Sequence, residues 1–276
     1  MPVLCMINQK GGCGKSSSCF HLAGAFAADD RRVLLIDADP QGSISQGFFG
    51  SEVIESLPAN KTLAVLYDEE LQFVDRSRLI LETPVKNIDI VLANSHLADH
   101  NSPRPELKGD LQYAIRDFLE EYGAGYDIVL IDCPPNLYTC SWTAMIAADH
   151  VLIPVPPEDF GTQGIRAVHQ AISNARVLNP GLRRLGHLLT RVDNRLIIHR
   201  RYEEELRSAY GNYVLDTVIP EASAFKVALT CRMPVQFSQG DSKAARLTRQ
   251  LAAEIDARIA SRSPKPVNKQ HAAGGV

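Results

Sequence analysis

The sequence predicts an α/β fold with a doubly wound, mostly parallel sheet. Short apolar runs alternate along the chain with helical patterns, and this alternation favours parallel strands joined by crossover helices. Several runs are apolar at successive positions, which is typical of strands covered on both faces. The 276 residues are 45% hydrophobic and 22% charged. This composition is that of an ordinary globular protein with an ample core.

The apolar runs and the helical patterns give the expected elements in order. Strands are expected at residues 3–8, 33–37, 88–93, 126–132, 151–155, 185–192 and 214–219. Helices are expected at residues 16–28, 107–122, 164–178, 200–210 and 242–260. The last helix carries one apolar stripe, formed by Leu247, Leu251, Ile255 and Ile259 at intervals of four. We expect residues 1–260 to form a single domain and residues 261–276 to form a disordered basic tail.

Charge is distributed unevenly along the chain. Residues 1–180 carry 13 Lys and Arg against 23 Asp and Glu, whereas residues 181–276 carry 16 against 9. The basic C-terminal part predicts a face that meets a polyanion. No apolar stretch approaches the roughly 20 residues of a membrane span, and we expect no signal peptide. The six cysteines form no C-x-x-C pair, which favours reduced thiols and the cytoplasm.

A glycine-rich loop follows the first apolar run. Residues 10–17 read K-G-G-C-G-K-S-S. Glycines let successive backbone N–H groups point at phosphate oxygens, and the following helix adds its positive end. We expect Lys15 to contact the β- and γ-phosphates and the Ser16 hydroxyl to bind Mg²⁺. The nucleotide-binding residues expected in the loop are Gly11, Gly12, Cys13, Gly14, Lys15, Ser16 and Ser17.

Carboxylates end two further apolar runs. Residues 33–43 read V-L-L-I-D-A-D-P-Q-G-S, and residues 128–135 read I-V-L-I-D-C-P-P. The carboxyl ends of parallel strands share one edge of a sheet, so these carboxylates are expected beside the loop. We expect Asp132 to hold Mg²⁺ through a water molecule, Asp37 to lie near the metal and Asp39 to orient the attacking water. Taken singly, each aspartate is as readily explained as a strand-end cap or turn former.

The three motifs together resemble the deviant Walker ATPases, specifically the ParA family that partitions plasmids, chromosomes and other cargo. Residues 190–195, T-R-V-D-N-R, are similar to the family's T-M-Y-D-x-R segment. The resemblance covers residues 1–260, although residues 50–105 are unspecific. We expect a Soj-like member, without a helix-turn-helix extension before the first strand. The resemblance implies a P-loop NTPase fold and the use of ATP, ADP and Mg²⁺.

The resemblance also implies a mechanism. Lys10, the second lysine of the loop, would reach across a face-to-face homodimer to the partner's ATP, so Lys10, Lys15 and Asp39 would be the catalytic residues. Hydrolysis would be slow and stimulated by a ParB-like or other cargo-adaptor protein. The implied location is the cytoplasm, in association with the nucleoid. The cargo is left open.

Members of this family bind DNA without sequence preference through basic side chains of the C-terminal part. Here the family's I-P-R-N-x-R segment reads I-P-E-A-S-A at residues 219–224, so both arginines are missing. Arg195 matches the arginine of the family's T-M-Y-D-x-R segment, and other basic residues close by in the sequence would substitute for the missing pair. The expected DNA contacts are Arg191, Arg195, Arg200, Arg201, Lys226, Arg232, Lys243 and Arg246.

Three other classes share the loop. A MinD-like positioning ATPase would bind a surface other than DNA, but the last sixteen residues are polar and cannot form an amphipathic membrane anchor. Nitrogenase reductases bridge an iron–sulfur cluster, and their glycine-rich cluster loops are absent. A metabolic P-loop kinase needs a substrate pocket and lid that the sequence does not indicate.

Overall fold

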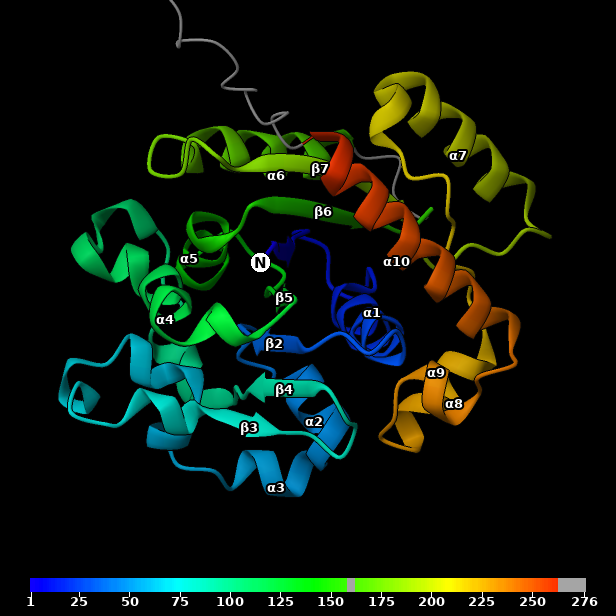
Figure 1. Cartoon of the computed structure of the whole chain (residues 1–276). Coiled ribbons are helices and arrows are strands. Elements are labelled where there is room, and N and C mark those ends of the chain that lie inside the picture. The colour runs from blue at the N-terminus through cyan, green and yellow to red at the C-terminus, as the bar shows by residue number, and fades with distance from the viewer. Residues whose placement is uncertain (158–161, 263–276) are drawn as a thin grey trace, which may run out of the picture.

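The computed structural model describes residues 1–157 and 162–262 and contains one seven-stranded sheet (Figure 1). The strand order is β3-β4-β2-β5-β1-β6-β7, and only the edge strand β3 is antiparallel to its neighbour. The predicted doubly wound, mostly parallel sheet is therefore confirmed. The strands are β1 (Val3–Met6), β2 (Val33–Asp37), β3 (Ile80–Glu82), β4 (Ile88–Val91), β5 (Ile128–Asp132), β6 (His150–Val155) and β7 (Arg183–Leu189).

Ten α-helices are present in the described residues, together with short 3₁₀ turns. They are α1 (Lys15–Ala28), α2 (Ser43–Phe49), α3 (Ser51–Glu55), α4 (Ala114–Tyr122), α5 (Thr139–Ala147), α6 (Thr162–Ala175), α7 (Ile197–Tyr210), α8 (Ser223–Thr230), α9 (Val235–Ser238) and α10 (Lys243–Arg262). No helix in residues 1–157 and 162–262 is long and apolar enough to cross a membrane. The tail expected at residues 261–276 lies outside the described residues from residue 263 onward.

The sheet is buried on both faces, as the continuous apolar runs predict. Val3 and Cys5 of β1 pack into a core with α4, α5 and α6, whereas Leu4 and Met6 pack into a second core with α1 and α10. Successive side chains of a strand point to opposite faces, so a strand between two helical layers must be apolar at every position. Figure 1 shows α1 and α10 side by side over one face of the sheet.

The topology brings the three sequence motifs to one edge of the sheet. β1 lies between β5 and β6, and β2 lies on the other side of β5. In this register Asp132, at the end of β5, is paired with Met6 on one side and with Asp37 on the other. The loop that follows β1 and the carboxylates that end β2 and β5 therefore share the carboxyl edge, where open α/β sheets bind their ligands.

The strand expected at residues 214–219 is absent, and that prediction is wrong. Val214 makes one isolated bridge with His187, and Pro220, directly after the segment, makes another with Val192. The backbone N–H groups of Asp216 and Thr217 donate instead to the Glu254 carboxylate of α10, each at 2.8 Å. A side chain thus takes the donors that a ladder would need.

The helix expected at residues 107–122 is shorter than predicted, since only α4 is α-helical there. Gly109 has a φ of +54°, outside the α-helical region, and the residues before α4 form two 3₁₀ turns. The predictions missed α5, whose residues from Thr139 to Ile146 are all buried. A helix buried on all sides has no polar face and gives no periodic signal.

Gly24 fixes the position of α1 under the C-terminal helices. A Cβ atom there would collide with the Pro234 ring, which directly precedes α9. We expect Gly24→Ala to lower the free energy of unfolding by about 1–3 kcal/mol, because overpacking outweighs the gain in helix propensity. Urea denaturation measures the change. Gly164→Ala in α6, where a Cβ meets nothing within 4 Å, is the matched control and should be neutral or stabilising. Equal stability of the two variants would contradict this packing argument.

Candidate nucleotide-binding site

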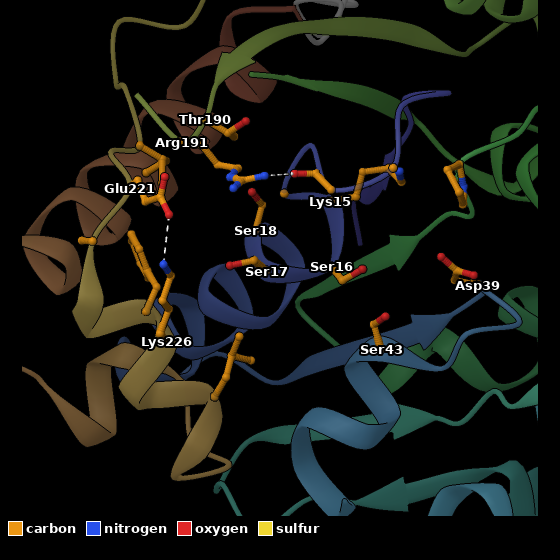
Figure 2. A pocket seen from close by; sticks show the side chains of 18 of the residues that line it. Lys15, Ser16, Ser17, Ser18, Asp39, Ser43, Thr190, Arg191, Glu221 and Lys226 are labelled. Atoms are coloured by element: carbon orange, nitrogen blue, oxygen red, sulfur yellow. Dashed lines mark hydrogen bonds and ion pairs between the residues drawn. The ribbon is translucent and has the colours of Figure 1, made fainter. Parts of the chain in front are cut away.

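A cavity of about 530 Å³ lies at the carboxyl edge of the sheet (Figure 2). One side is formed by the glycine loop and the first turn of α1, and the other by residues that follow β7 and by α8. The expected residues that line it are Gly11, Gly12, Gly14, Lys15, Ser16, Ser17 and Asp39. The structure therefore brings most of the predicted nucleotide-binding residues around one space.

The loop backbone has the geometry of an anion cradle. Gly12 and Gly14 have φ angles of +70° and +89°, values that L side chains rarely adopt. Gly14 is the N-cap of α1, and no side chain caps the N–H groups of the first turn. A helix N-terminus without a side-chain cap presents donors and positive potential to an anion.

Lys15 is buried and folded along the loop. Its Nζ donates to the backbone oxygens of Asn8 and Lys10, both at 3.1 Å, and lies 3.7 Å from the Cys13 sulfur. Cys13 is buried below the loop and does not line the cavity. Burial raises the pKa of the Cys13 thiol, which keeps it protonated. Lys10 is partly exposed at the head of the loop and does not line the cavity of its own chain.

Asp37 ends β2 in full burial and is held by α2. Its Oδ2 accepts hydrogen bonds from the backbone N–H and the hydroxyl of Ser45, at 2.9 and 2.7 Å. Burial raises the pKa of Asp37 to about 7, although the Ser45 hydrogen bonds oppose the shift. The Ser45 hydrogen bonds tie the Asp37 carboxylate to α2, and neither Asp37 nor Asp132 is among the residues that line the cavity. The place of Asp37 near the metal stays a prediction.

Asp132 ends β5 and is the carboxylate with the strongest need for a cation. It is fully buried, and within the described residues neither carboxylate oxygen completes a hydrogen bond, although the Ser16 hydroxyl is close enough to favour the charged form. Burial and the neighbouring charge of Asp37 raise the pKa of Asp132 well above its usual value. Hard oxygen ligands of this kind suit Mg²⁺. Ser16 and Asp132 therefore fit a magnesium site.

Asp39 lies two residues beyond β2 and lines the cavity across from the loop (Figure 2). Its Oδ1 accepts a hydrogen bond from the backbone N–H of Gln41 at 3.0 Å. Burial raises the pKa of Asp39, while the Gln41 hydrogen bond and the charge of Lys15 oppose the shift. Asp39 is thus a carboxylate that faces the same space as Lys15 and Ser16.

Sequence reasoning missed that the segment after β7 holds the loop. The Thr190 hydroxyl donates to the backbone oxygen of Cys13 at 2.7 Å. Arg191 Nη1 donates to the backbone oxygen of Gly12 at 3.0 Å (Figure 2). Arg191 has a φ of +56°, which is unusual for a residue with a side chain. No local pattern signals these contacts, because they join residues about 180 positions apart.

An apolar wall adjoins the loop and was also missed. Its residues are Ile219, Pro220, Ala222, Phe225 and Leu229. Small-molecule sites combine such walls with a few placed polar groups. The phosphate-binding side and the apolar side together match the two chemistries of a nucleotide.

The eight basic residues expected to contact DNA lie in different settings. Arg191 and Lys226 line the nucleotide cavity. Three others lie around Asn194. Arg195 follows Asn194 in the sequence, and Arg200 donates to the Asn194 backbone oxygen at 2.8 Å. Lys243 and Asn194 line the same hollow. The remaining three, Arg201, Arg232 and Arg246, are exposed elsewhere along the C-terminal part.

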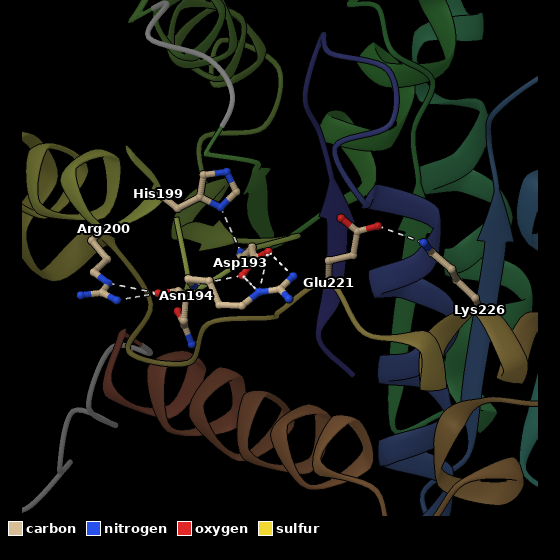
Figure 3. Close-up of polar contacts among 7 residues, drawn as sticks. Asp193, Asn194, His199, Arg200, Glu221 and Lys226 are labelled. Carbon is tan, nitrogen blue, oxygen red and sulfur yellow. Dashed lines mark hydrogen bonds and ion pairs between the residues drawn. The ribbon is translucent and has the colours of Figure 1, made fainter. Parts of the chain in front are cut away.

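Carboxylates accompany this basic surface (Figure 3). Arg195 forms a two-bond pair with Asp193, with distances of 2.9 and 2.7 Å, and Lys226 pairs with Glu221 at 3.0 Å. The Arg195 hydrogen bonds lower the pKa of Asp193 to about 2, and Lys226 likewise lowers the pKa of Glu221. The surface is therefore mixed in charge, and the glutamate that replaces a family arginine is paired within the chain.

Comparison with known proteins connects this site to a family. The family model described as "AAA domain" matches residues 1–183. The chromosome partitioning protein ParA of Caulobacter vibrioides is 34% identical over 95% of this chain and 97% of its own. The chromosome-partitioning ATPase Soj of Thermus thermophilus is 33% identical over 93% of this chain and 96% of its own.

A solved structure shows the ligands that such a fold holds. Cobyrinic acid a,c-diamide synthase from Mycobacterium smegmatis, with a bound ATP analogue and magnesium, superposes with a TM-score of 0.77. It is 26% identical and covers 95% of this chain and 96% of its own. The family resemblance predicted from the loop and carboxylate motifs is thus confirmed, and the chain belongs to the ParA/Soj family of partitioning ATPases.

Proposed function

We propose that this protein is a Mg²⁺-dependent ATPase that closes into a homodimer around ATP and, in that state, binds DNA without sequence preference to position a cargo. The observation that carries the proposal is that the glycine loop, with Lys15 and Ser16, and Asp39 line one and the same cavity. ATP hydrolysis then returns the subunits to the free pool. A ParB-like or other adaptor protein stimulates that step.

Different residues of the cavity bind different parts of Mg²⁺–ATP in this proposal. The backbone of the glycine loop and Lys15 hold the phosphates, and the apolar wall beside α8 receives the base. Ser16 and Asp132 hold Mg²⁺, which when bound neutralises charge on the phosphates. Asp39 faces the phosphate end and orients the attacking water.

Dimerisation depends on Lys10 in this proposal. Its side chain lies at the head of the loop, outside the cavity of its own chain. A cation at that position would reach a partner's phosphates when two loops face each other, and added positive charge there stabilises phosphoryl transfer. ATP thus serves as part of the interface.

The alternative is a MinD-like positioning ATPase that uses a track other than DNA. The carboxylates paired with Arg195 and Lys226 are the features that favour it. The two functions differ in whether random-sequence DNA binds the ATP state.

We expect Asp39→Ala to lower the rate of ATP hydrolysis by about 10²-fold or more, because the attacking water loses its orienting group. ATP binding should persist, so the ATP-bound dimer should accumulate. Phosphate release and light scattering measure the two effects. Asp110→Ala, at an exposed carboxylate outside the cavity, is the control. Hydrolysis at the normal rate in Asp39→Ala would refute the assignment.

We expect Lys10→Ala to remain monomeric with ATP while binding the nucleotide within roughly tenfold of the wild-type affinity, because Lys15 and the loop backbone still hold the phosphates. Light scattering at several protein concentrations, combined with a nucleotide titration, separates the effects. Lys86→Ala removes an exposed lysine outside the cavity and should dimerise normally. A normal ATP dimer of Lys10→Ala would rule out the contact with the partner's phosphates.

We expect a random-sequence DNA duplex to bind with ATP but not with ADP, and to bind more weakly at higher salt. Arg195→Gln and Arg200→Gln should each weaken binding and lower the salt slope by about one. The matched control is Arg78→Gln, since Arg78 is also exposed and paired with a carboxylate, Asp75 at 3.2 Å. Absence of DNA binding in every nucleotide state would favour the MinD-like alternative.

A further inference from the structure

A second cavity, of about 410 Å³, lies at the amino end of β7. Thr190, which contacts the glycine loop, directly follows the other end of this strand. A seven-residue strand spans about 23 Å, so the cavity is separate from the nucleotide site. It is lined by α6, β7 and the turn after α7, through His169, Ile172, Ser173, Arg176, Arg183, Arg184 and Tyr213.

The cavity is strongly basic. Three guanidinium groups line it, and no aspartate or glutamate is among its lining residues in the described part of the chain. Within residues 1–157 and 162–262, no carboxylate lies within 4.0 Å of the guanidinium group of Arg176 or Arg183. Like charges held together repel one another, so this arrangement is most stable when an anion lies between them.

Two of the three guanidinium groups, those of Arg176 and Arg184, are held in place by the fold. Arg176 Nε donates to the backbone oxygen of Leu182 at 2.9 Å. Arg184 lies over the Tyr213 ring, 3.8 Å from its centroid, and its Nη1 lies 3.0 Å from Nε2 of His169. Side chains positioned in advance lose less conformational entropy when a ligand binds.

His169, which lines the cavity, and its neighbour His187 stay neutral and so add no charge of their own. Nε2 of His169 lies 3.0 Å from Nε2 of His187, which is fully buried. Burial, followed by the charge of Arg184, lowers the pKa of His169 to about 4. Burial also lowers the pKa of His187 to about 3. The positive charge of the cavity therefore comes from the arginines alone near neutral pH.

We propose that this cavity binds a small anion carrying two linked phosphate groups, at a site distinct from the ATP site. Planar guanidinium groups match phosphate oxygens through paired hydrogen bonds, and several arginines can share two phosphates. The volume of about 410 Å³ suits a small ligand. A duplex would instead need cations spread along an open face.

Inorganic pyrophosphate is the probe, and the readout must be local because the glycine loop also binds phosphates. We expect the imidazole signals of ¹³C-labelled His169 and His187 to shift and saturate below about 1 mM pyrophosphate at constant ionic strength. The protein is first loaded with one equivalent of ADP. Unmoved signals of both histidines at that concentration would overturn the proposal.

The variants separate a built site from general attraction to a basic surface. Arg183→Gln should weaken pyrophosphate binding at least tenfold, because it removes one of the three guanidinium groups of the cavity. The Arg183 side chain makes no hydrogen bond among the described residues, so we expect the variant to fold normally. Arg176→Gln should act similarly. Arg166→Gln, at an exposed site on α6 outside the cavity, is the matched control and should change the affinity less than twofold.

Two results would count against the proposal. One is that Arg183→Gln and Arg166→Gln bind pyrophosphate with equal affinity while both variants keep the thermal unfolding of the wild type. The other is a shift of the His169 signal by a 20-base-pair duplex but not by pyrophosphate, which would make this surface part of a DNA interface.

Discussion

The site is organised by the burial of ionisable groups at one edge of the sheet. Asp37, Asp39, Asp132 and Lys15 are all less than 10% exposed. Burial raises the pKa of each carboxyl group, and Asp132 is shifted further by the neighbouring charge of Asp37. Charged groups are seldom buried without opposite charge or hydrogen bonds, since their desolvation is costly. A magnesium ion brings positive charge to the carboxylates, and phosphates bring negative charge to Lys15.

The sheet could be predicted because its signals are local and its constraints are strong. β1, β2 and β5 are buried on both faces, so each must be a continuous apolar run, and the chirality of crossovers then leaves few arrangements. The segment 214–219 is also largely apolar in sequence but is not a strand. Glu254, some 38 residues further on, takes the donors of its backbone. A competing partner that distant in sequence leaves no trace in a local pattern.

The glycine-loop side of the cavity could be predicted for the same reason, because residues 10–17 are contiguous and glycine is required where φ is positive. The apolar side could not. Its apolar wall comes from Pro220 and from Phe225 and Leu229 of α8, which are ordinary apolar residues until the fold places them opposite the loop. The basic residues were predicted from the charge of the C-terminal part and, for Arg195, from the family resemblance. Neither shows that Arg191 lines the cavity while Arg195 faces solvent.

β7 connects the basic cavity to the segment that contacts the glycine loop. Its first residues carry Arg183 and Arg184 of the basic cavity, and the residues that follow it hold the glycine loop through Thr190 and Arg191. Asp193 and Arg195 form their ion pair on the surface two and four residues beyond Arg191. Any displacement of the loop by a bound nucleotide therefore acts on this segment through direct hydrogen bonds. Arg191 holds this contact with a φ of +56°, so the residue that ties the segment to the loop also has a strained backbone.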